Sequence, residues 1–188
     1  MRNCLSSSAA AVLGATFIAW ALGGCTSGPT TDVPVRTPDV PAALRVPAGQ
    51  VPFLEALATG VQIYECAAKA DGSGYEWAFR APEAQLADRA GRPIGRHYAG
   101  PTWESGDGSS VVGAGSGRDP GPDPSAIPWL LLTAKSTTGT GVFAKTASIQ
   151  RLQTHAGIAP SEPCSATNLK QIARVPYTAT YYFYRAAA

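Results

Sequence analysis

Tyr177-Thr178-Ala179-Thr180-Tyr181-Tyr182-Phe183-Tyr184 is the stretch near the end of the chain that decides the fold. Aromatic and β-branched residues of this kind favour β-strands. Successive side chains of a strand point to opposite faces, so one face carries Tyr177, Ala179, Tyr181 and Phe183 and the other carries Thr178, Thr180, Tyr182 and Tyr184. Both faces hold bulky groups. This pattern predicts a central strand that is covered on both sides.

Further segments of strand length precede this stretch, and turn residues separate them. They are Val61 to Ala67, Tyr75 to Ala81, Ser109 to Gly113, Trp129 to Lys135 and Ser148 to Leu152. Residues 88–92 and 105–108 read as tight turns between short strands. The sequence therefore predicts an all-β domain, an antiparallel sandwich or barrel with long loops and at most a short helix.

Two segments complete this prediction. Pro52 to Thr59 is compatible with a helix at the entrance of the domain. Residues 114–128 contain Gly, Asp and four prolines, and a simple hairpin needs fewer residues. We expect this second segment to form either a mobile surface loop or a flap that covers a site.

Composition excludes one large class of function. The chain contains 20 Gly and 16 Pro, only 15% of its residues are charged, and its formal net charge is +2. Proteins that bind nucleic acid usually show a basic patch or stripe. We therefore expect no nucleic-acid partner.

The N-terminus carries an export signal. Arg2 precedes the mostly apolar, uncharged run from Leu5 to Leu22, as in a secretory signal peptide. The following Leu22-Gly23-Gly24-Cys25 resembles the lipobox of bacterial lipoproteins, which implies cleavage before Cys25 and lipid attachment to its sulfur. Cleavage by an ordinary signal peptidase near Ala21 or Gly24 and an uncleaved membrane helix are the alternatives.

The lipobox reading divides the chain into three parts. Residues 1–24 are a lipoprotein signal peptide, residues 25–47 a tether rich in Pro and Thr, and residues 48–188 a single β-rich domain. The expected location is the cell envelope, as an outer-membrane lipoprotein that faces the periplasm or the cell surface. Its partner is then the membrane, which it contacts through the lipid anchor.

Two cysteines remain after export and lipidation, Cys66 and Cys164. In an oxidising compartment an even remainder is most simply a disulfide. Such a bond closes a long loop and stabilises the fold by up to ~4 to 5 kcal/mol in the chain-entropy model. A redox or metal-binding thiol pair is the alternative, but the pair lacks Cys-x-x-Cys spacing.

The densest run of functional side chains spans residues 97–107. It contains the candidate ligand-binding or catalytic residues His97, Tyr98, Trp103, Glu104 and Asp107. His97, Glu104 and Asp107 form a metal or acid/base site if the turn at residues 100–101 brings them together. The alternative is structural, with His97 bonded to backbone and the acids capping turns.

Aromatic and basic side chains give two further candidates. Trp103 lies beside Gly-Pro and an acid, and we expect it to be the exposed aromatic that stacks on a glycan or another small-molecule ligand. Lys135 and Arg151 meet an anion if adjacent strands point them to the same side. Alternatively, each ends a strand with its charged head in water.

The motifs together resemble one family, domain of unknown function 3455, over roughly Val46 to Tyr184. They are Gln62-Ile63-Tyr64-Glu65-Cys66, Trp77 with Ala81-Pro82, Gly95 to Trp103, Asp107-Gly108-Ser109, Ile127 with Trp129-Leu130-Leu131, Ile149-Gln150-Arg151-Leu152, and Tyr177 to Tyr184. The resemblance implies a secreted domain found in bacteria and fungi, and it carries no activity over.

A nicotinamide cofactor is not expected. The glycine run at residues 113–117 is followed by Asp and prolines. A dinucleotide fingerprint instead needs a helix N-terminus at that point to bind the pyrophosphate. We therefore predict no cofactor.

The sequence supports two hypotheses of function. The first is a lipid-anchored, noncatalytic module of the cell envelope that binds a ligand or another envelope component. The second is a secreted hydrolase-type or metal-dependent enzyme that uses the segment from His97 to Asp107. Whether His97, Glu104 and Asp107 converge in a cleft separates the two.

Overall fold

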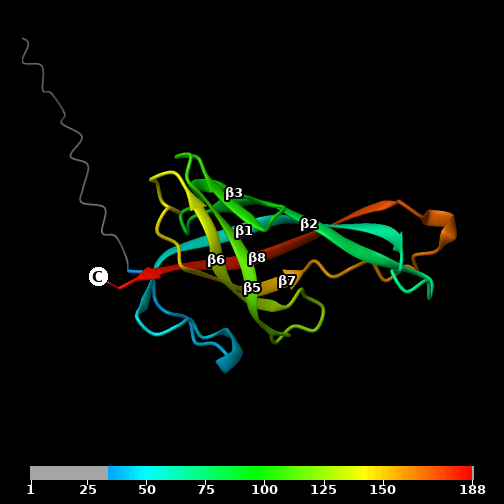
Figure 1. The fold of residues 1–188 in the computed structure, drawn as a ribbon, viewed down its shortest axis with the longest axis horizontal. Helices are drawn as coiled ribbons and strands as arrows, with labels where there is room; N and C mark the ends of the chain where they lie inside the picture. Colours follow the sequence, from blue (N-terminus) through cyan, green and yellow to red (C-terminus); the bar gives the residue numbers. More distant parts are fainter. Residues whose placement is uncertain (1–33, 188) are drawn as a thin grey trace, which may run out of the picture. The chain divides into compact units, whose positions relative to one another are not determined.

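The computed structural model describes residues 34–187, which form a closed antiparallel barrel of eight strands (Figure 1). Each strand pairs with the next, and β8 closes the ring against β1. The strands are β1 (Gln50–Ala68), β2 (Tyr75–Ala87), β3 (Pro93–Tyr98), β4 (Thr102–Ser105), β5 (Ser110–Asp119), β6 (Trp129–Thr138), β7 (Ser148–Ala156) and β8 (Ile172–Ala186). The all-β prediction is confirmed, in its barrel form.

Short helices are the only other regular elements in the described part. They are the 3₁₀ turns η1 (Ala42–Leu44) and η2 (Ala166–Asn168). The described residues include no helix that is long and apolar enough to span a membrane. The predicted signal peptide at 1–24, the predicted lipobox Cys25 and the part of the predicted tether before Pro34 lie outside the described residues.

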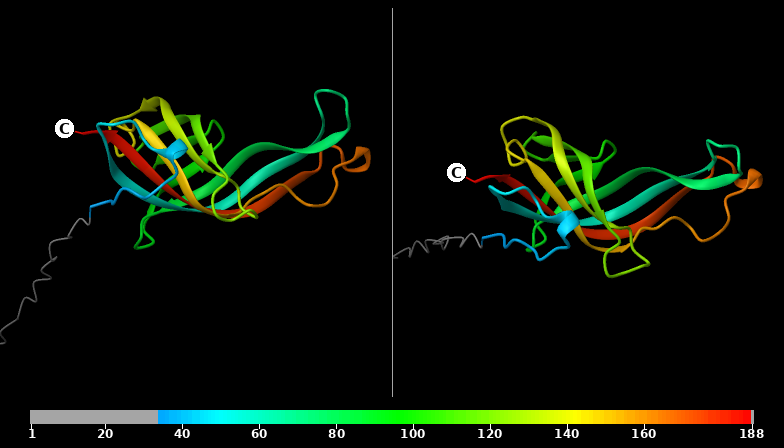
Figure 2. Two further views of the ribbon diagram at one scale, coloured as in Figure 1. Left: turned by 90° about the horizontal axis from the view of Figure 1, so that it is seen from below. Right: turned by 60° about the horizontal axis from the view of Figure 1, so that its bottom comes forward.

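Three strands continue past the barrel. The first half of β2, the second half of β1 and the first half of β8 form an arm that projects from one end of the ring (Figure 2). The disulfide between Cys66 and Cys164 ties the β1 strand of this arm to the loop before β8. The predicted pairing of these cysteines is confirmed.

Both faces of β8 are covered from Ala179 to Tyr184, as its sequence predicts, although Thr178 on the outer face is exposed. Tyr177, Ala179, Tyr181 and Phe183 belong to the core inside the barrel. Tyr182 and Tyr184 belong to a second cluster on the outside of the wall. The bulky groups on the two faces of this strand therefore belong to two separate apolar layers, one inside the barrel and one outside its wall.

The outer layer is completed by a segment that we name the strap, residues 34–47. Its Leu44 is fully buried, and Val35, Val40 and Val46 pack against the same cluster. We expected these residues to belong to the tether, but in the structure they cover the outer face of the wall. Prolines prevent a long helix here, yet the strap still buries Leu44 of the short turn η1 and packs valines on both sides of it against the wall.

The helix expected at Pro52 to Thr59 is wrong, because these residues lie within β1. Ala56 and Ala58 are buried inside the barrel while Leu57 between them is exposed, the two-residue period of a strand. In the β1–β8 register, Ala56 faces Tyr181. Pairing along the whole of β8 outweighs the local preference for a helix.

The long loop expected at residues 114–128 is also shorter than predicted. Its first part continues β5, which pairs with β6 from Ser110 to Asp119. Gly117 permits close packing, because a Cβ there would collide with the Ala43 carbonyl oxygen of the strap, whereas Gly115 has open space beside it. The glycine run is therefore part of a strand rather than a sign of a loop.

Candidate functional site

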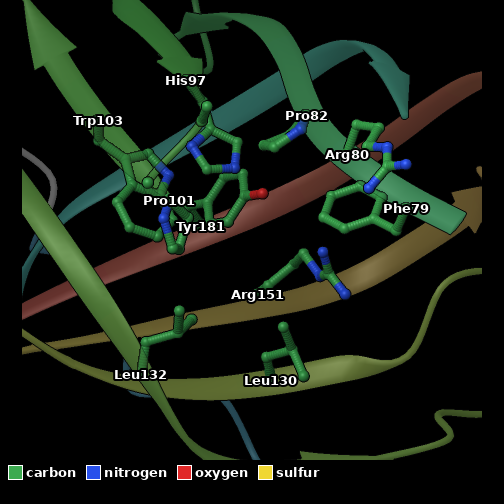
Figure 3. A pocket seen from close by; sticks show the side chains of 12 residues that line it. Phe79, Arg80, Pro82, His97, Pro101, Trp103, Leu130, Leu132, Arg151 and Tyr181 are labelled. Atoms are coloured by element: carbon green, nitrogen blue, oxygen red, sulfur yellow. The ribbon is translucent and has the colours of Figure 1, made fainter. Parts of the chain in front are cut away.

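A cavity of about 300 Å³ opens inside the barrel where the arm begins (Figure 3). We call it the barrel cavity. Its volume lies at the small end of the usual range for ligand pockets. It is lined by Phe79, Arg80, Pro82, His97, Ala99, Gly100, Pro101, Trp103, Leu130, Leu132, Arg151 and Tyr181.

Register explains why distant residues meet there. Arg151 on β7 lies opposite Leu130 on β6 and opposite Tyr181 on β8. On the neighbouring part of the wall, His97 on β3 lies opposite Trp103 on β4. Inward side chains that share a register position on adjacent strands become neighbours, so two short rows of residues build the cavity wall.

Aromatic rings form one side of the cavity. The rings of His97 and Trp103 stack with centroids 4.4 Å apart, and Tyr181 meets both edge-on. Trp103 is only 1% exposed. The exposed aromatic platform expected for a glycan is therefore not there, because pairing with His97 turns the indole into the barrel.

His97 is an uncharged histidine. Its Nδ1 lies 2.8 Å from the Thr102 carbonyl oxygen, which can only accept, so Nδ1 carries the proton. Burial lowers the pKa of His97 to about 4, with the charge of Arg151 acting in the same direction. At neutral pH its Nε2 is consequently a hydrogen-bond acceptor.

Arg151 is the cation of the cavity that has no acidic partner. Its Nε and Nη2 donate to the Pro128 carbonyl oxygen at 3.2 and 2.8 Å. None of the ion pairs among residues 34–187 includes it, whereas Arg80 is paired with Glu65 at 3.0 Å. No Asp or Glu lines this cavity, so an uncompensated positive charge faces it.

Two polar groups beside this cation have no hydrogen-bond partner among the described residues. They are the Tyr181 hydroxyl and the Trp103 Nε1. Burial raises the pKa of Tyr181, which keeps its proton and hence its capacity to donate. Buried polar groups are nearly always bonded, so these two donors in the cavity wall are unusual.

The other predicted site residues lie outside the barrel. The Tyr98 hydroxyl donates to Glu104 at 2.6 Å, and Arg96 forms an ion pair with the same carboxylate at 2.9 Å. Adjacent residues of a strand face opposite sides, so Trp103 points inward and Glu104 outward. These three residues form a surface cluster rather than a part of the cavity.

Asp107 stabilises a turn. Its carboxylate accepts hydrogen bonds from Ser109 and from the Val142 N–H, at 2.6 to 2.8 Å, and these bonds lower its pKa to about 2. His97, Glu104 and Asp107 thus do not converge. Among the described residues no group of three His, Cys, Asp or Glu side chains could hold a metal ion.

Sequence reasoning found His97 and Trp103 but missed most of the cavity. It considered Arg151 together with Lys135, and the structure separates them, because Lys135 is exposed and does not line the cavity. The available signal was that Arg151 follows Ile149 by two residues, which places both on one face of a strand. Phe79, Leu130 and Leu132 carried no comparable signal. Residues 114–128 do not line the cavity, so the expected flap does not cover it.

Comparison with known proteins gives one match. The family described as "Protein of unknown function (DUF3455)" matches residues 47–185. Neither the curated proteins nor the solved structures searched give a match.

Proposed function

We propose that this chain, which belongs to the DUF3455 family of proteins of unknown function, binds a small amphipathic molecule in the barrel cavity and does not transform it. The observation that carries the proposal is a half-open cavity with an apolar wall and unbonded donors. Ligand pockets are mostly apolar with a few placed polar groups. Leu130, Leu132 and Trp103 supply the first feature, and Tyr181 supplies the second.

The same residues favour binding over catalysis. The acids that the enzyme hypothesis needs, Glu104 and Asp107, are engaged in an outer surface cluster and in a turn. The cavity itself contains a neutral histidine whose pKa of about 4 makes it a weak base at neutral pH. A binding role uses all of the cavity's features without a catalytic pair.

The proposal includes a place of action in the cell envelope. The disulfide between Cys66 and Cys164 supports an oxidising compartment. The lipobox at Leu22 to Cys25 supports a lipid anchor. The anchor is testable by itself: Cys25→Ser should leave unprocessed precursor, and mass spectrometry of the native N-terminus decides the point. An unmodified N-terminus at another residue would remove the anchor from the proposal.

Ligand binding is tested with the neutral fluorescent probe N-phenyl-1-naphthylamine. We expect the purified protein to bind it with enhanced emission that saturates at one probe per chain. Leu130→Trp fills the cavity and should abolish the signal. Leu57→Trp, at an exposed position of β1, is the matched control and should leave it unchanged.

The result that overturns the proposal is equally specific. Equal probe binding by the wild type and by folded Leu130→Trp would show that the probe binds elsewhere. Absence of binding to the wild type would show that the cavity does not accept small apolar molecules. Circular dichroism of each variant verifies that the barrel is intact.

A further inference from the structure

We infer that the ligand of the barrel cavity carries a carboxylate, and that Arg151 binds this carboxylate with Tyr181 as a second donor. The inference rests on the proposed function and names the chemical class of its ligand.

Charge gives the first argument. Arg151 faces the cavity with no carboxylate within ion-pair distance among the described residues, and its bonds to the protein go to a neutral carbonyl. A guanidinium carries five N–H donors in a planar fork. The Pro128 oxygen takes the Nε and one Nη2 donor, so donors on the terminal nitrogens remain for a ligand.

Position gives the second argument. Arg151 and Tyr181 occupy the same register position on neighbouring strands. In Figure 3 the Tyr181 hydroxyl points away from Trp103 and toward the side of the cavity where the Arg151 guanidinium lies. Tyr181 is 1% exposed, and its hydroxyl has no hydrogen bond of normal length in the described part of the chain, although Tyr177 and Arg151 lie close enough to affect its pKa. A guanidinium and a hydroxyl on one side of a cavity together match the two oxygens of a carboxylate.

The balance of charges in the cavity favours a carboxylate over a more highly charged anion. One unpaired cation compensates one negative charge, because the second guanidinium at the cavity, Arg80, already binds Glu65. The remaining wall is apolar, formed by Leu130, Leu132 and Trp103. The cavity therefore fits a monocarboxylate with an apolar body.

Competition against N-phenyl-1-naphthylamine tests the charge preference. The competitors are cinnamate and cinnamamide, which have the same shape and differ in charge, together with phenyl phosphate. We expect cinnamate to displace the probe at concentrations at least tenfold lower than either of the other two. Equal displacement by cinnamate and cinnamamide would overturn the inference, and stronger displacement by phenyl phosphate would assign the site to phosphate instead.

Variants test the two donors. Arg151→Gln should weaken cinnamate binding about 10- to 100-fold, the range expected for a lost charged hydrogen bond, and should bring the affinities of cinnamate and cinnamamide close together. Arg151→Lys keeps the charge without the planar fork and should fall between. Lys135→Gln, an exposed cation away from the cavity, should have no effect. An unchanged cinnamate affinity in Arg151→Gln would refute the role of Arg151.

Failure of the two proposals can be told apart. If the neutral probe does not bind the wild type, the proposed function fails. If the probe binds but no preference for the acid appears, only the present inference fails. Should Arg151→Gln not fold, Tyr181→Phe provides the second measurement: it should weaken cinnamate binding about three- to tenfold, and more than it weakens cinnamamide binding. Unchanged cinnamate binding in Tyr181→Phe would then overturn the assignment.

Discussion

Two tyrosines three residues apart on β8 show how differently the two sides of the barrel wall are built. Both Tyr184 and Tyr181 are buried. On the outer face the Tyr184 hydroxyl donates to the Gln150 amide oxygen at 2.7 Å, and the Gln150 amide nitrogen donates to the Leu44 carbonyl of the strap at 2.7 Å. On the inner face the Tyr181 hydroxyl has no partner among the described residues.

The difference separates a structural polar group from a candidate functional one. Burial does not distinguish the two tyrosines, because each is closed off from water. Hydrogen bonding does, because the chain itself completes the outer network and leaves the inner one incomplete. A buried donor that lacks a partner costs free energy, and a ligand bound as proposed would recover that cost. The following predictions test this contrast, beginning with the largest expected effect.

Replacement of the central inner aromatic should be the most damaging change. Trp103→Ala should lower the free energy of unfolding by about 3 to 5 kcal/mol, as expected for a fully buried indole. Urea denaturation measures the loss. Trp129→Ala removes a half-buried indole from the outer cluster and should cost less. Equal losses for the two variants would contradict the assignment of Trp103 to the core.

Acid should destabilise the inner face through His97. The unfolded state binds a proton at the ordinary pKa of 6.5, but the folded state binds it only near pKa 4. The free energy of unfolding is therefore highest, as far as His97 is concerned, above pH 6.5. It falls as the pH drops toward 4, by about 3 kcal/mol in all.

Denaturation curves at several pH values between 7 and 4 measure this fall. His97→Gln keeps a polar side chain that does not titrate, so its stability should depend less steeply on pH in this window. Asp107, with a pKa of about 2, titrates mainly below the window and remains as a background in both proteins. Parallel curves for wild type and variant would contradict the neutral state of His97.

Loss of the outer hydroxyl should have an intermediate effect. Tyr184→Phe leaves the Gln150 amide oxygen without its donor inside a buried network, which should cost about 1 to 3 kcal/mol of stability. Thermal unfolding measures the change. A neutral effect of Tyr184→Phe alone would remove the contrast between the two faces.

The inner hydroxyl should matter least for stability. Tyr181→Phe removes a group that has no partner among the described residues, so stability should change by no more than about 0.5 kcal/mol. The same thermal unfolding experiment is the measurement, and Tyr184→Phe is its matched comparison. A loss as large as that of Tyr184→Phe would show that the Tyr181 hydroxyl is bonded within the protein.

Local patterns in the sequence were sufficient for part of this structure. The alternation at residues 177–184 predicted a strand with two covered faces, and the count of cysteines predicted the pair Cys66 and Cys164. The same kind of pattern failed at Pro52 to Thr59, where pairing with β8 decides the conformation. Neither the pattern of residues in a strand nor the number of cysteines tells which strand will pair with it.

The site was harder to predict for the same reason. Trp103 seemed exposed because its neighbours in sequence are Gly, Pro and an acid, whereas its neighbours in space are His97 and Tyr181. Arg151 seemed free to reach water, but barrel closure turns it inward beside Tyr181. Whether a buried polar group is bonded depends on the residues across the barrel, and these come from strands far away in the sequence.

The strap also limits how far the barrel can stand from its point of attachment. A tether over residues 26–47 would have reached about 80 Å at ~3.6 Å per extended residue, but residues 34–47 lie folded on the wall. With lipid on Cys25, as proposed, only residues 26–33 connect the anchor to the strap, and they span about 30 Å at most. The barrel then stays close to the bilayer surface, within reach of molecules that leave or enter the membrane.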